Sequence, residues 1–240
     1  MATSADATLR VFRFQPGQDE KPRFDTYHVQ AKSGMTVLDA LFQVLDDQDG
    51  SLAFRYSCRG AICGSCAMYI NGSYRLACQT QLANLGAGPV SVNPLPHLPI
   101  IKDLAVDMAP FFDKYEKVMP YLLGEERPPE KEFQQSIDQR KKIDEAIDCI
   151  LCGCCYSSCP SVWTNKSYLG PAALTKAYRF VADSRDKAYD ERLAIVSGEE
   201  GVWRCHTIFN CVEACPKKIN CTYSIQELKK KTLTRRLKFW

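Results

Sequence analysis

Two runs of cysteine constrain this 240-residue chain more than any other feature of its sequence. If Cys154 is set aside, the first run, residues 149–160, has the spacing C-x2-C-x2-C-x3-C-P. Thiols that recur every three residues drift around a straight helix, so this run predicts a loop wrapped around one small object. The second run, residues 205–216, repeats the spacing, with Ile208 at the place of its second cysteine.

Clustered cysteines of this kind indicate bound metal. The chain holds 13 cysteines, and it does not begin with a basic segment followed by an apolar one, so we expect no signal peptide. Disulfide frameworks belong to short secreted proteins, whereas clustered cysteines in a reducing compartment more often bind metal. The spacing is that of bacterial two-cluster ferredoxins, in which the fourth cysteine of a run binds the other iron–sulfur cluster.

This crossing rule divides the thiols of the two runs into two sets. The predicted ligands of a [4Fe–4S] cluster are Cys149, Cys152, Cys155 and Cys215, and those of the second cluster are Cys159, Cys205 and Cys211. Ile208 offers no lone pair at the fourth position of the second set, so a [3Fe–4S] cluster is predicted there. A second [4Fe–4S] cluster, completed by a spare thiol or by water, remains open. Cys154, in the loop of the first cluster, and Cys221 are interpreted as bystanders.

An earlier group of cysteines has a different spacing. The pattern C-x4-C-x2-C with one later cysteine is the plant-type [2Fe–2S] arrangement, and its predicted ligands are Cys58, Cys63, Cys66 and Cys78. We expect Gly60 and Gly64 to give the loop the backbone freedom that inward-pointing N–H groups require. Arg59 places a positive charge beside the anionic cluster. Zinc is the alternative, but structural zinc sites usually pair two short cysteine knuckles.

Hydrophobic periodicity divides the chain into two regions. Residues 8–31 alternate like two strands around a Pro16-Gly17 turn, and a helical period follows Thr36, the expected N-cap. An Asn71-Gly72 turn and a strand at 90–92 complete a small α+β domain, predicted for residues 1–99. The remainder, residues 100–240, is predicted to be mostly helical. Its expected helical segments are an amphipathic stretch at 100–123 interrupted at Pro110, then 137–147, 171–183, 186–196 and 222–240.

Charge and hydropathy exclude some partners. The net charge of +3, from 31 basic and 28 acidic residues, is too small to indicate a nucleic-acid partner. No stretch approaches the roughly 18 apolar residues that a membrane-spanning helix needs. Any association with a membrane is therefore expected to be peripheral.

The three cysteine groups together resemble the iron–sulfur subunits of succinate dehydrogenase and quinol:fumarate reductase over nearly the whole chain. The likeness rests on the first cysteine loop, the end of its hairpin and the stretch between the two runs: residues 55–66, 76–78, Ser161, 170–172 and 183–186. The resemblance implies an α+β protein with an N-terminal β-grasp plant-type [2Fe–2S] ferredoxin domain. An all-α domain of the bacterial-ferredoxin kind is expected to follow.

For function, the resemblance implies an electron relay between the FAD of a flavoprotein subunit and a quinone at the membrane anchor, with haem in the anchor left open. The chain shows no acid–base or nucleophilic constellation, so substrate chemistry is expected in the partner. The expected location is the cytoplasmic side of the inner membrane, where partner subunits hold the chain. Two alternatives are a ferredoxin-like carrier for another dehydrogenase and a zinc-stabilised interaction protein without a redox role.

The resemblance also maps an expected edge of the quinone pocket onto five residues: Pro160, Ser161, Trp163, His206 and Ile208. The indole N–H of Trp163 is expected either to donate to a quinone carbonyl or to lie in a packed interface with the anchor. Relatives that oxidise succinate often carry a second tryptophan where this chain has Thr164. Together with the stretch 94–104, this difference favours slightly a menaquinol-linked fumarate reductase.

Overall fold

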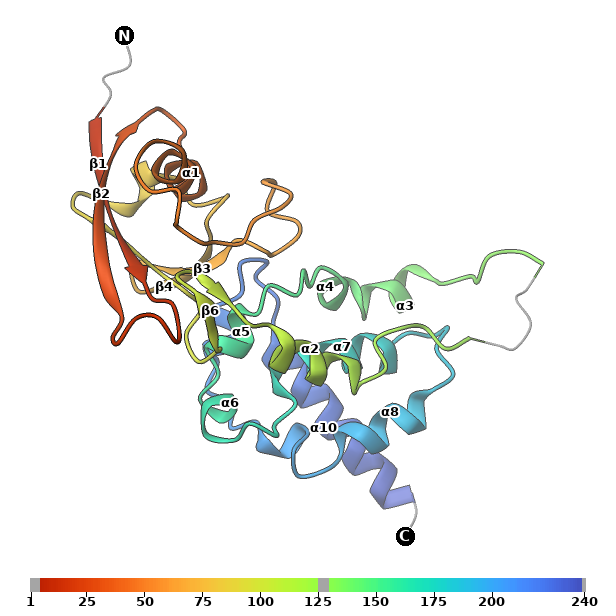
Figure 1. Ribbon diagram of the computed structural model, residues 1–240. Coiled ribbons are helices and arrows are strands. Elements are labelled where there is room, and N and C mark those ends of the chain that lie inside the picture. Colours follow the sequence, from red (N-terminus) through yellow and green to blue (C-terminus); the bar gives the residue numbers. More distant parts are fainter. Residues whose placement is uncertain (1–4, 125–129, 239–240) are drawn as a thin grey trace. The chain divides into compact units, whose positions relative to one another are not determined.

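The computed structural model describes residues 5–124 and 130–238, and the chain forms two compact units (Figure 1). The first unit contains the chain up to Met108 together with Ile150–Ser157. The second contains Ala109–Cys149 and the chain from Ser158 onward. The chain therefore leaves the first unit, returns to it briefly and leaves again. The boundary expected between residues 99 and 100 stays a prediction.

The first unit is built on a mixed five-stranded sheet with the strand order β2-β1-β5-β3-β4. β1 and β5 are parallel, and the other neighbouring strands are antiparallel. A parallel pair needs a long crossover connection, and here the crossover carries α1 and the β3–β4 hairpin. This arrangement confirms the predicted β-grasp class. The bounds are β1 Ala5–Arg13, β2 Arg23–Ala31, α1 Val37–Asp47, β3 Ala67–Ile70, β4 Ser73–Leu76, the 3-10 helix η1 Leu82–Leu85 and β5 Val90–Asn93.

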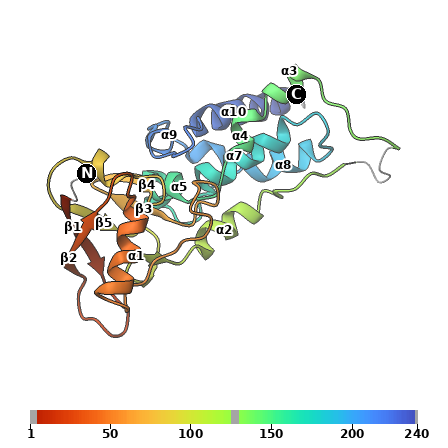
Figure 2. The same ribbon diagram turned by 90° about the horizontal axis from the view of Figure 1, so that it is seen from above.

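Helix α1 packs against the sheet because its apolar residues share one face. Val37, Leu41 and Val44 are fully buried, at the spacing of an amphipathic helix. Thr36 caps the helix as predicted: its hydroxyl accepts the N–H of Asp39 (3.2 Å), and the Asp39 carboxylate accepts the N–H of Thr36 (2.9 Å). Such a cap stabilises a helix by about 1 kcal/mol. Figure 2 shows α1 beside β2, which it contacts.

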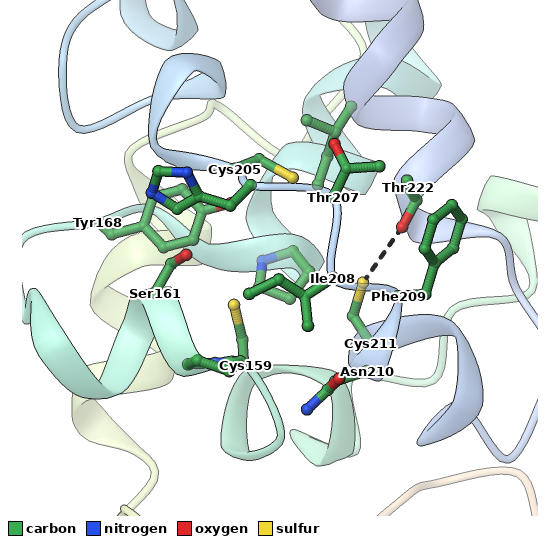
Figure 3. Close-up of a pocket in the computed structure, with 14 residues that line it drawn as sticks. Cys159, Ser161, Tyr168, Cys205, Thr207, Ile208, Phe209, Asn210, Cys211 and Thr222 are labelled. Carbon is green, nitrogen blue, oxygen red and sulfur yellow. Dashed lines mark hydrogen bonds between the residues drawn. The ribbon is translucent and has the colours of Figure 1, made fainter.

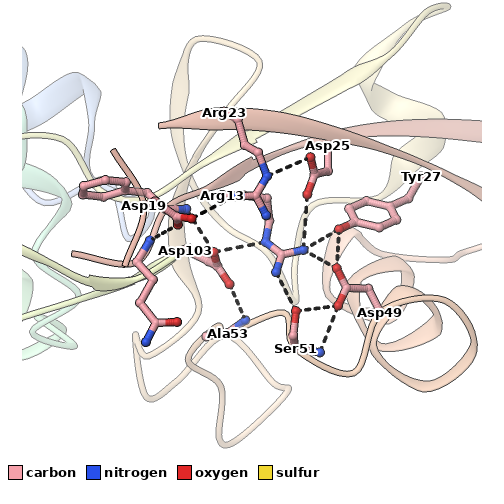
Figure 4. Close-up of polar contacts among 11 residues, drawn as sticks. Arg13, Asp19, Arg23, Asp25, Tyr27, Asp49, Ser51, Ala53 and Asp103 are labelled. Carbon is pink, nitrogen blue, oxygen red and sulfur yellow. Dashed lines mark hydrogen bonds and ion pairs between the residues drawn. The ribbon is translucent and has the colours of Figure 1, made fainter. Parts of the chain in front are cut away.

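A buried arginine joins distant segments of the first unit (Figure 4). Arg13 is 4% exposed, and its guanidinium pairs with Asp103 (3.0 Å) and with Asp49. The Asp103 carboxylate also accepts the backbone N–H groups of Phe14 (3.0 Å) and Ala53 (3.1 Å). Removing one partner of a buried ion pair costs about 3–5 kcal/mol, so this network holds the segment around Asp103 in the first unit.

That segment corrects one prediction. Residues 100–106 form a hairpin instead of the start of an amphipathic helix: β6 (Ile100–Lys102) pairs with β7 (Ala105–Val106). Asp103, in its turn, has a φ of 49° and is fixed there by the Arg13 network. Helix α2 (Ala109–Glu116) begins only afterwards, with Pro110 in its first turn, where proline is tolerated.

The second unit is helical and is organised around α7. This helix is buried on nearly all sides, because it contacts α2, α4, α8 and α10. Figures 1 and 2 both show α7 and α10 side by side. None of the described helices is both long and apolar enough to cross a membrane. The remaining bounds are α3 Ile137–Lys141, α4 Asp144–Ile147, α6 Pro160–Thr164, α7 Gly170–Val181, α8 Tyr189–Val196, η2 Val202–Arg204, α9 Asn210–Glu213 and α10 Cys221–Lys238, while α5 (Cys154–Ser157) belongs to the first unit.

Helices form in three of the predicted segments, 171–183, 186–196 and 222–240, whereas residues 117–123 of the predicted stretch 100–123 are not helical. Helix α8 lies within its expected stretch, and α7 and α10 each begin one residue before theirs. Asn220 Oδ1 caps α10 by accepting the N–H of Tyr223 (2.8 Å). The last two predicted positions, residues 239–240, lie outside the described chain. The expected helix at 137–147 is broken into α3 and α4. Ile143 is fully buried while α3 buries none of its residues, so the chain bends to turn Ile143 inward.

A second buried arginine holds the connection that follows α2. Arg192, on α8, has no exposed surface, and its Nη2 pairs with Asp186 (2.8 Å). The same guanidinium donates to the carbonyls of Val118 (2.9 Å), Met119 and Tyr121 (2.6 Å). The planar fork of arginine is what allows one side chain to hold several acceptors at once. Arg192 therefore fixes residues 118–121 on α8.

Candidate metal centres

The first group of predicted ligands lies in the loop before β3 and directly after β4. The β3–β4 hairpin brings Cys66 and Cys78 together: the N–H of Ala77 donates to the carbonyl of Cys66 (2.9 Å), and the N–H of Cys78 donates to Cys66 Sγ (3.5 Å). The turn uses Asn71 and Gly72, with φ of 46° and 74°, as an Asn-Gly hairpin requires. The chain thus folds Cys78 back as the turn predicts.

Backbone N–H groups surround the sulfur of Cys58. Those of Gly60, Ile62 and Cys63 donate to Cys58 Sγ at 3.4, 3.4 and 3.3 Å. Hydrogen bonds to the charged form of a group favour that form, and the thiolate is the form of cysteine that binds metal. The loop is therefore shaped to stabilise an anionic sulfur.

The left-handed positions of this loop are Arg59, Ala61 and Gly64, with φ of 54°, 58° and 73°. Gly60 is not one of them, so the expectation that it supplies this freedom is wrong, whereas that for Gly64 is confirmed. A positive φ is uncommon for residues other than glycine. Arg59 and Ala61 adopt it where their neighbours' N–H groups turn toward Cys58 Sγ.

The thiols of this group differ in how readily they ionise. Burial opposes ionisation of Cys63, but hydrogen bonds from Ser65 and from the backbone of Cys58 outweigh it and lower its pKa to about 6. Burial raises the pKa of Cys66 to about 12. Thiols release their protons when they bind metal, so the N–H donors and the nearby Arg59 charge fit the needs of a thiolate-bound cluster.

Arg59 is held against aromatic rings next to Cys58. Its guanidinium carbon lies 4.6 Å from the centre of the Phe42 ring and 5.7 Å from that of Tyr56. Phe42 and Tyr56 contact each other edge to face, with ring centres 4.6 Å apart. Cation–π contacts of this kind are worth about 0.5–1 kcal/mol at exposed sites. They keep a fixed positive charge beside the cysteine loop.

The cysteine loop also touches the first cysteine run within the first unit. A Cβ added to Gly64 would lie 2.8 Å from the Cα and Cβ atoms of Cys152 and from the carbonyl oxygen of Ile150. Real Cβ atoms essentially never come that close. Gly64 therefore serves two needs, a left-handed backbone and the close approach of a second ligand-bearing loop.

The four predicted [4Fe–4S] ligands come from both units. Cys152 and Cys155 belong to the first, and Cys149 and Cys215 to the second, so this ligand set stays a prediction. Cys154 is fully buried, and its hydrogen bond lowers the pKa of Cys152 although burial opposes this.

Cysteines of both runs line one cavity in the second unit, called here the Ile208 cavity (Figure 3). Its volume is about 330 Å³, including the part open to solvent. The wall contains all three cysteines of the second predicted set: Cys159 before α6, Cys205 after η2 and Cys211 in α9. Ile208 lies in the same wall, at the place of the missing fourth thiol.

The rim of this cavity is apolar and partly exposed. Ile208 is 50% exposed and Phe209 is 49% exposed. Thr207 and Phe209, on either side of Ile208, have left-handed backbone with φ of 59° and 69°, which is rare for bulky residues. The backbone thus presents Ile208 at the surface and keeps it in the cavity wall.

Four of the five residues predicted at a quinone pocket lie together in this wall: Pro160, Ser161, His206 and Ile208. Trp163, on α6, is half-buried and is not among the described residues of the wall. Thr164 is exposed, and its hydroxyl donates to the carbonyl of Pro160 (3.1 Å). Their role toward a quinone stays a prediction.

Two buried polar residues of the wall were not predicted. Tyr168 is 1% exposed, and burial raises the pKa of its hydroxyl, as do the nearby thiols of Cys205, Cys159 and Cys211. Thr222 is 3% exposed, with its Oγ1 3.6 Å from Cys211 Sγ. Neither residue is part of a cysteine motif, so the sequence alone gives no sign that they line the cavity.

No three His, Cys, Asp or Glu side chains within residues 5–124 and 130–238 are arranged to hold a single metal ion. A [2Fe–2S] cluster with four cysteines takes two thiolates at each iron, and a cubane takes one at each iron. Neither kind of cluster requires three side chains around one ion, so the three predicted cysteine sets stay predictions.

Comparison with known families agrees with these sites. The model of the 2Fe–2S iron–sulfur cluster binding domain matches residues 8–113, and that of the 4Fe–4S dicluster domain matches residues 145–219. Fold, cysteine loops and both matches define an electron-transfer protein with a [2Fe–2S] ferredoxin domain and a helical [4Fe–4S] ferredoxin-like domain.

Relatives that match most of the chain show the family to which it belongs. The chain is 45% identical to the succinate dehydrogenase iron–sulfur subunit of Paracoccus denitrificans, over 92% of this chain and 86% of the relative. It therefore belongs to the family of succinate dehydrogenase iron–sulfur subunits. A mitochondrial member from Candida glabrata, described as the succinate dehydrogenase [ubiquinone] iron–sulfur subunit, is also 45% identical, over 93% and 90%. The Mycobacterium smegmatis Sdh1 complex in its apo form contains a chain of the same fold, with a TM-score of 0.88, 26% identity and 98% of both chains covered.

Proposed function

We propose that this chain relays electrons between the FAD of a flavoprotein subunit and a quinone at a membrane anchor. The observation that carries the proposal is the contact of Gly64 with the backbone of Cys152. It brings the loop of the first cysteine group against the loop that begins the second. A relay requires neighbouring redox groups to be close, whereas independent structural metal sites do not.

The proposed ligand sets follow the cysteine spacings: Cys58, Cys63, Cys66 and Cys78 for [2Fe–2S], Cys149, Cys152, Cys155 and Cys215 for [4Fe–4S], and Cys159, Cys205 and Cys211 for [3Fe–4S]. The third set is supported by the Ile208 cavity, whose wall carries an alkyl side chain in place of a fourth thiol. Cys221 is buried beside Cys211 and is not among the described residues of that wall. This favours [3Fe–4S] over a cubane completed by the spare thiol.

Bound iron–sulfur clusters supply one-electron oxidation and reduction. The side chains and backbone of this protein hold the thiolates, donate N–H groups to them and limit their contact with water. Burial decreases from Cys66 toward Cys58, which is exposed. Tyr56 and Ile62, near Cys58, are 46% and 69% exposed. We assign this apolar edge of the first unit to the flavoprotein.

The apolar rim of the Ile208 cavity is assigned to the membrane anchor and the quinone. Pro160, Ser161 and His206 form its edge together with Ile208, and Trp163 follows on the same short helix. Partner subunits would thus hold the chain peripherally on the cytoplasmic side of the inner membrane. The described chain contributes no membrane-spanning helix of its own.

For the working direction, the curated relatives named above favour succinate oxidation. The feature that favours menaquinol-driven fumarate reduction is Thr164, whose exposed side chain bonds to Pro160 within its own helix. Fumarate reduction is therefore the second candidate. Rates of succinate oxidation and of quinol-driven fumarate reduction in the purified complex decide between them.

Metal analysis and EPR of the purified complex test the relay itself. The sets predict nine iron atoms per chain (2 + 4 + 3), acid-labile sulfide, a [3Fe–4S] signal in the oxidised sample and a [2Fe–2S] signal after reduction. Zinc with a silent spectrum would refute the redox function. A chain that purifies alone and reduces another dehydrogenase's acceptor without a flavoprotein would support the independent carrier instead.

A further inference from the structure

Two of the buried hydroxyl groups in the wall of the Ile208 cavity, those of Thr222 and Tyr168, belong to neither the proposed metal ligands nor the proposed quinone edge. Thr222 lies in the first turn of α10 beside Cys211, and the two side chains form a hydrogen bond of 3.6 Å between Oγ1 and Sγ (Figure 3). Tyr168 precedes α7 and lies in the same cavity wall as Cys205. The Thr222 hydroxyl therefore adjoins Cys211 directly, and Tyr168 shares the wall with all three cysteines of the proposed [3Fe–4S] set.

Other threonines of α10 show that the contact of Thr222 is specific. Thr234 donates to the carbonyl of Lys230 (2.9 Å), the usual bond of a helical threonine to the preceding turn. Thr232 is 2% exposed, and its hydroxyl has no hydrogen-bond partner within the described chain. Thr222 lies in the first turn, where no helical turn precedes it, and its hydroxyl reaches out of the helix to Cys211.

The direction of this hydrogen bond is fixed once metal is bound. In the free thiol state either Thr222 or Cys211 can donate. A cysteine that binds iron has lost its proton, so Cys211 can then only accept, and Thr222 must donate. Cys221 is buried next to the same sulfur, but a thiol is a weak donor compared with a hydroxyl.

We propose that Thr222 and Tyr168 raise the reduction potential of the cluster held by Cys159, Cys205 and Cys211. Hydrogen bonds to the sulfurs are one of the determinants of an iron–sulfur potential. They stabilise the reduced cluster more than the oxidised one, because the reduced cluster carries one more negative charge. Both residues are positioning groups that act through the cysteines. This inference depends on the proposed function, since it requires a cluster in the Ile208 cavity.

The test is a redox titration of the intact complex, followed by the EPR signal of the oxidised [3Fe–4S] cluster. Thr222→Val removes the hydroxyl and nearly preserves the side-chain shape, while Thr222→Ser keeps the hydroxyl. We expect Thr222→Val to lower the midpoint potential by up to about 59 mV. For a one-electron couple, this shift corresponds to a tenfold fall in the ratio of reduced to oxidised cluster at a given potential. Thr222→Ser should remain within a quarter of that shift, and the [2Fe–2S] potential should not change.

Thr232→Val is the matched control, because it makes the same substitution at a buried position of the same helix without removing a hydrogen bond. It should leave the potential unchanged. Tyr168→Phe provides the second, independent variant and should also lower the potential. If Thr222→Val loses the cluster, Tyr168→Phe decides the question.

The possible results separate this inference from the proposed function. A wild-type complex without a [3Fe–4S] signal refutes the cluster assignment. The second result is a [3Fe–4S] signal in the wild type and the same midpoint potential in Thr222→Val and Tyr168→Phe, as far as these variants retain the cluster. It would refute the role of Thr222 and Tyr168 without contradicting the proposed relay. An equal shift in Thr232→Val would also refute this role, since the effect would then come from repacking of α10.

Discussion

At the scale of single residues, Ile208 is the position on which the proposed [3Fe–4S] assignment of the third cysteine set depends. The residue lies in the cavity wall with Cys159, Cys205 and Cys211 and is half-exposed, so a thiol there would face the same space without a large desolvation cost. Thr222 and Tyr168 act at the same scale, because we propose that they raise the reduction potential of that cluster.

Ile208→Cys is expected to convert [3Fe–4S] to [4Fe–4S], because it restores the fourth thiolate of the cubane spacing. The oxidised [3Fe–4S] EPR signal should disappear, and iron content should rise by about one atom per chain. Ile208→Val, which adds no ligand, should keep the original signal. A variant with cysteine at this position that retains a full [3Fe–4S] signal would show that position 208 does not face the open corner.

At the scale of elements, the loop before β3 depends on one glycine for its contact with the first cysteine run. Gly64 has a φ of 73°, and a Cβ there would meet Cys152 and Ile150 at 2.8 Å. Gly72, in the Asn-Gly turn, has nearly the same φ of 74°, but a Cβ there would meet nothing within 4 Å. Substitution at Gly72 therefore tests the cost of a left-handed backbone alone, whereas substitution at Gly64 adds the cost of the close contact with Cys152 and Ile150.

Gly64→Ala should therefore be more harmful than Gly72→Ala. Both substitutions cost about 1–2 kcal/mol for left-handed alanine, and only Gly64→Ala adds an overpacking cost of about 1–3 kcal/mol. We expect a lower thermal unfolding midpoint and reduced [2Fe–2S] content for Gly64→Ala, measured by calorimetry and by EPR of the reduced complex. Equal effects of the two substitutions would mean that the loops separate without consequence.

The connection after α2 depends in the same way on Arg192. Arg192→Lys keeps the charge but loses the planar fork that holds the carbonyls of Val118, Met119 and Tyr121. We expect a loss of about 1–3 kcal/mol in unfolding free energy, the cost of buried carbonyls left without a donor, and faster tryptic cleavage after Lys117. Arg140→Lys is the control: its ion pair with Asp144 is more than half exposed, so its loss should cost less than about 1 kcal/mol. Unaltered cleavage in Arg192→Lys would contradict this role.

At the scale of the whole molecule, residues 150–157 belong to the first unit although they follow the second in sequence. Ser157 supplies two of the bonds: its carbonyl accepts the Tyr74 hydroxyl (3.2 Å), and its hydroxyl donates to the carbonyl of Pro96. Met108 and Leu95 pack against the backbone of Gly153. These contacts lie within one unit and tie its last segment to its sheet.

Hydrogen exchange of the intact complex tests this membership. We expect the amides of 150–157 to exchange together with those of β3 and β4, since segments of one cooperative unit open together. The amides of α7 and α10 provide the comparison. Exchange of 150–157 in step with α7, at a rate different from that of β3, would assign the segment to the second unit instead.

Sequence alone predicted the parts of this structure that depend on local signals. Thr36 caps α1 and Asn71-Gly72 forms its turn because both depend on residues a few positions away. The hairpin at 100–106 was missed because Arg13, far away in sequence, holds its turn through Asp103. Tyr168 and Thr222 were missed for the same kind of reason: no spacing relates them to the cysteines, and only the fold brings them to the cavity.

The return of residues 150–157 also sets an order of events during synthesis. The roughly forty residues between Met108 and Ile150 take on the order of 2–8 seconds to translate at about 5–20 residues per second. Throughout that interval the sheet of the first unit and its cysteine loop have been synthesised, while the surface of Gly64 that meets Cys152 is still uncovered. The first unit therefore cannot reach its final structure as an N-terminal piece alone, and its completion must wait until the chain has been made as far as Ser157.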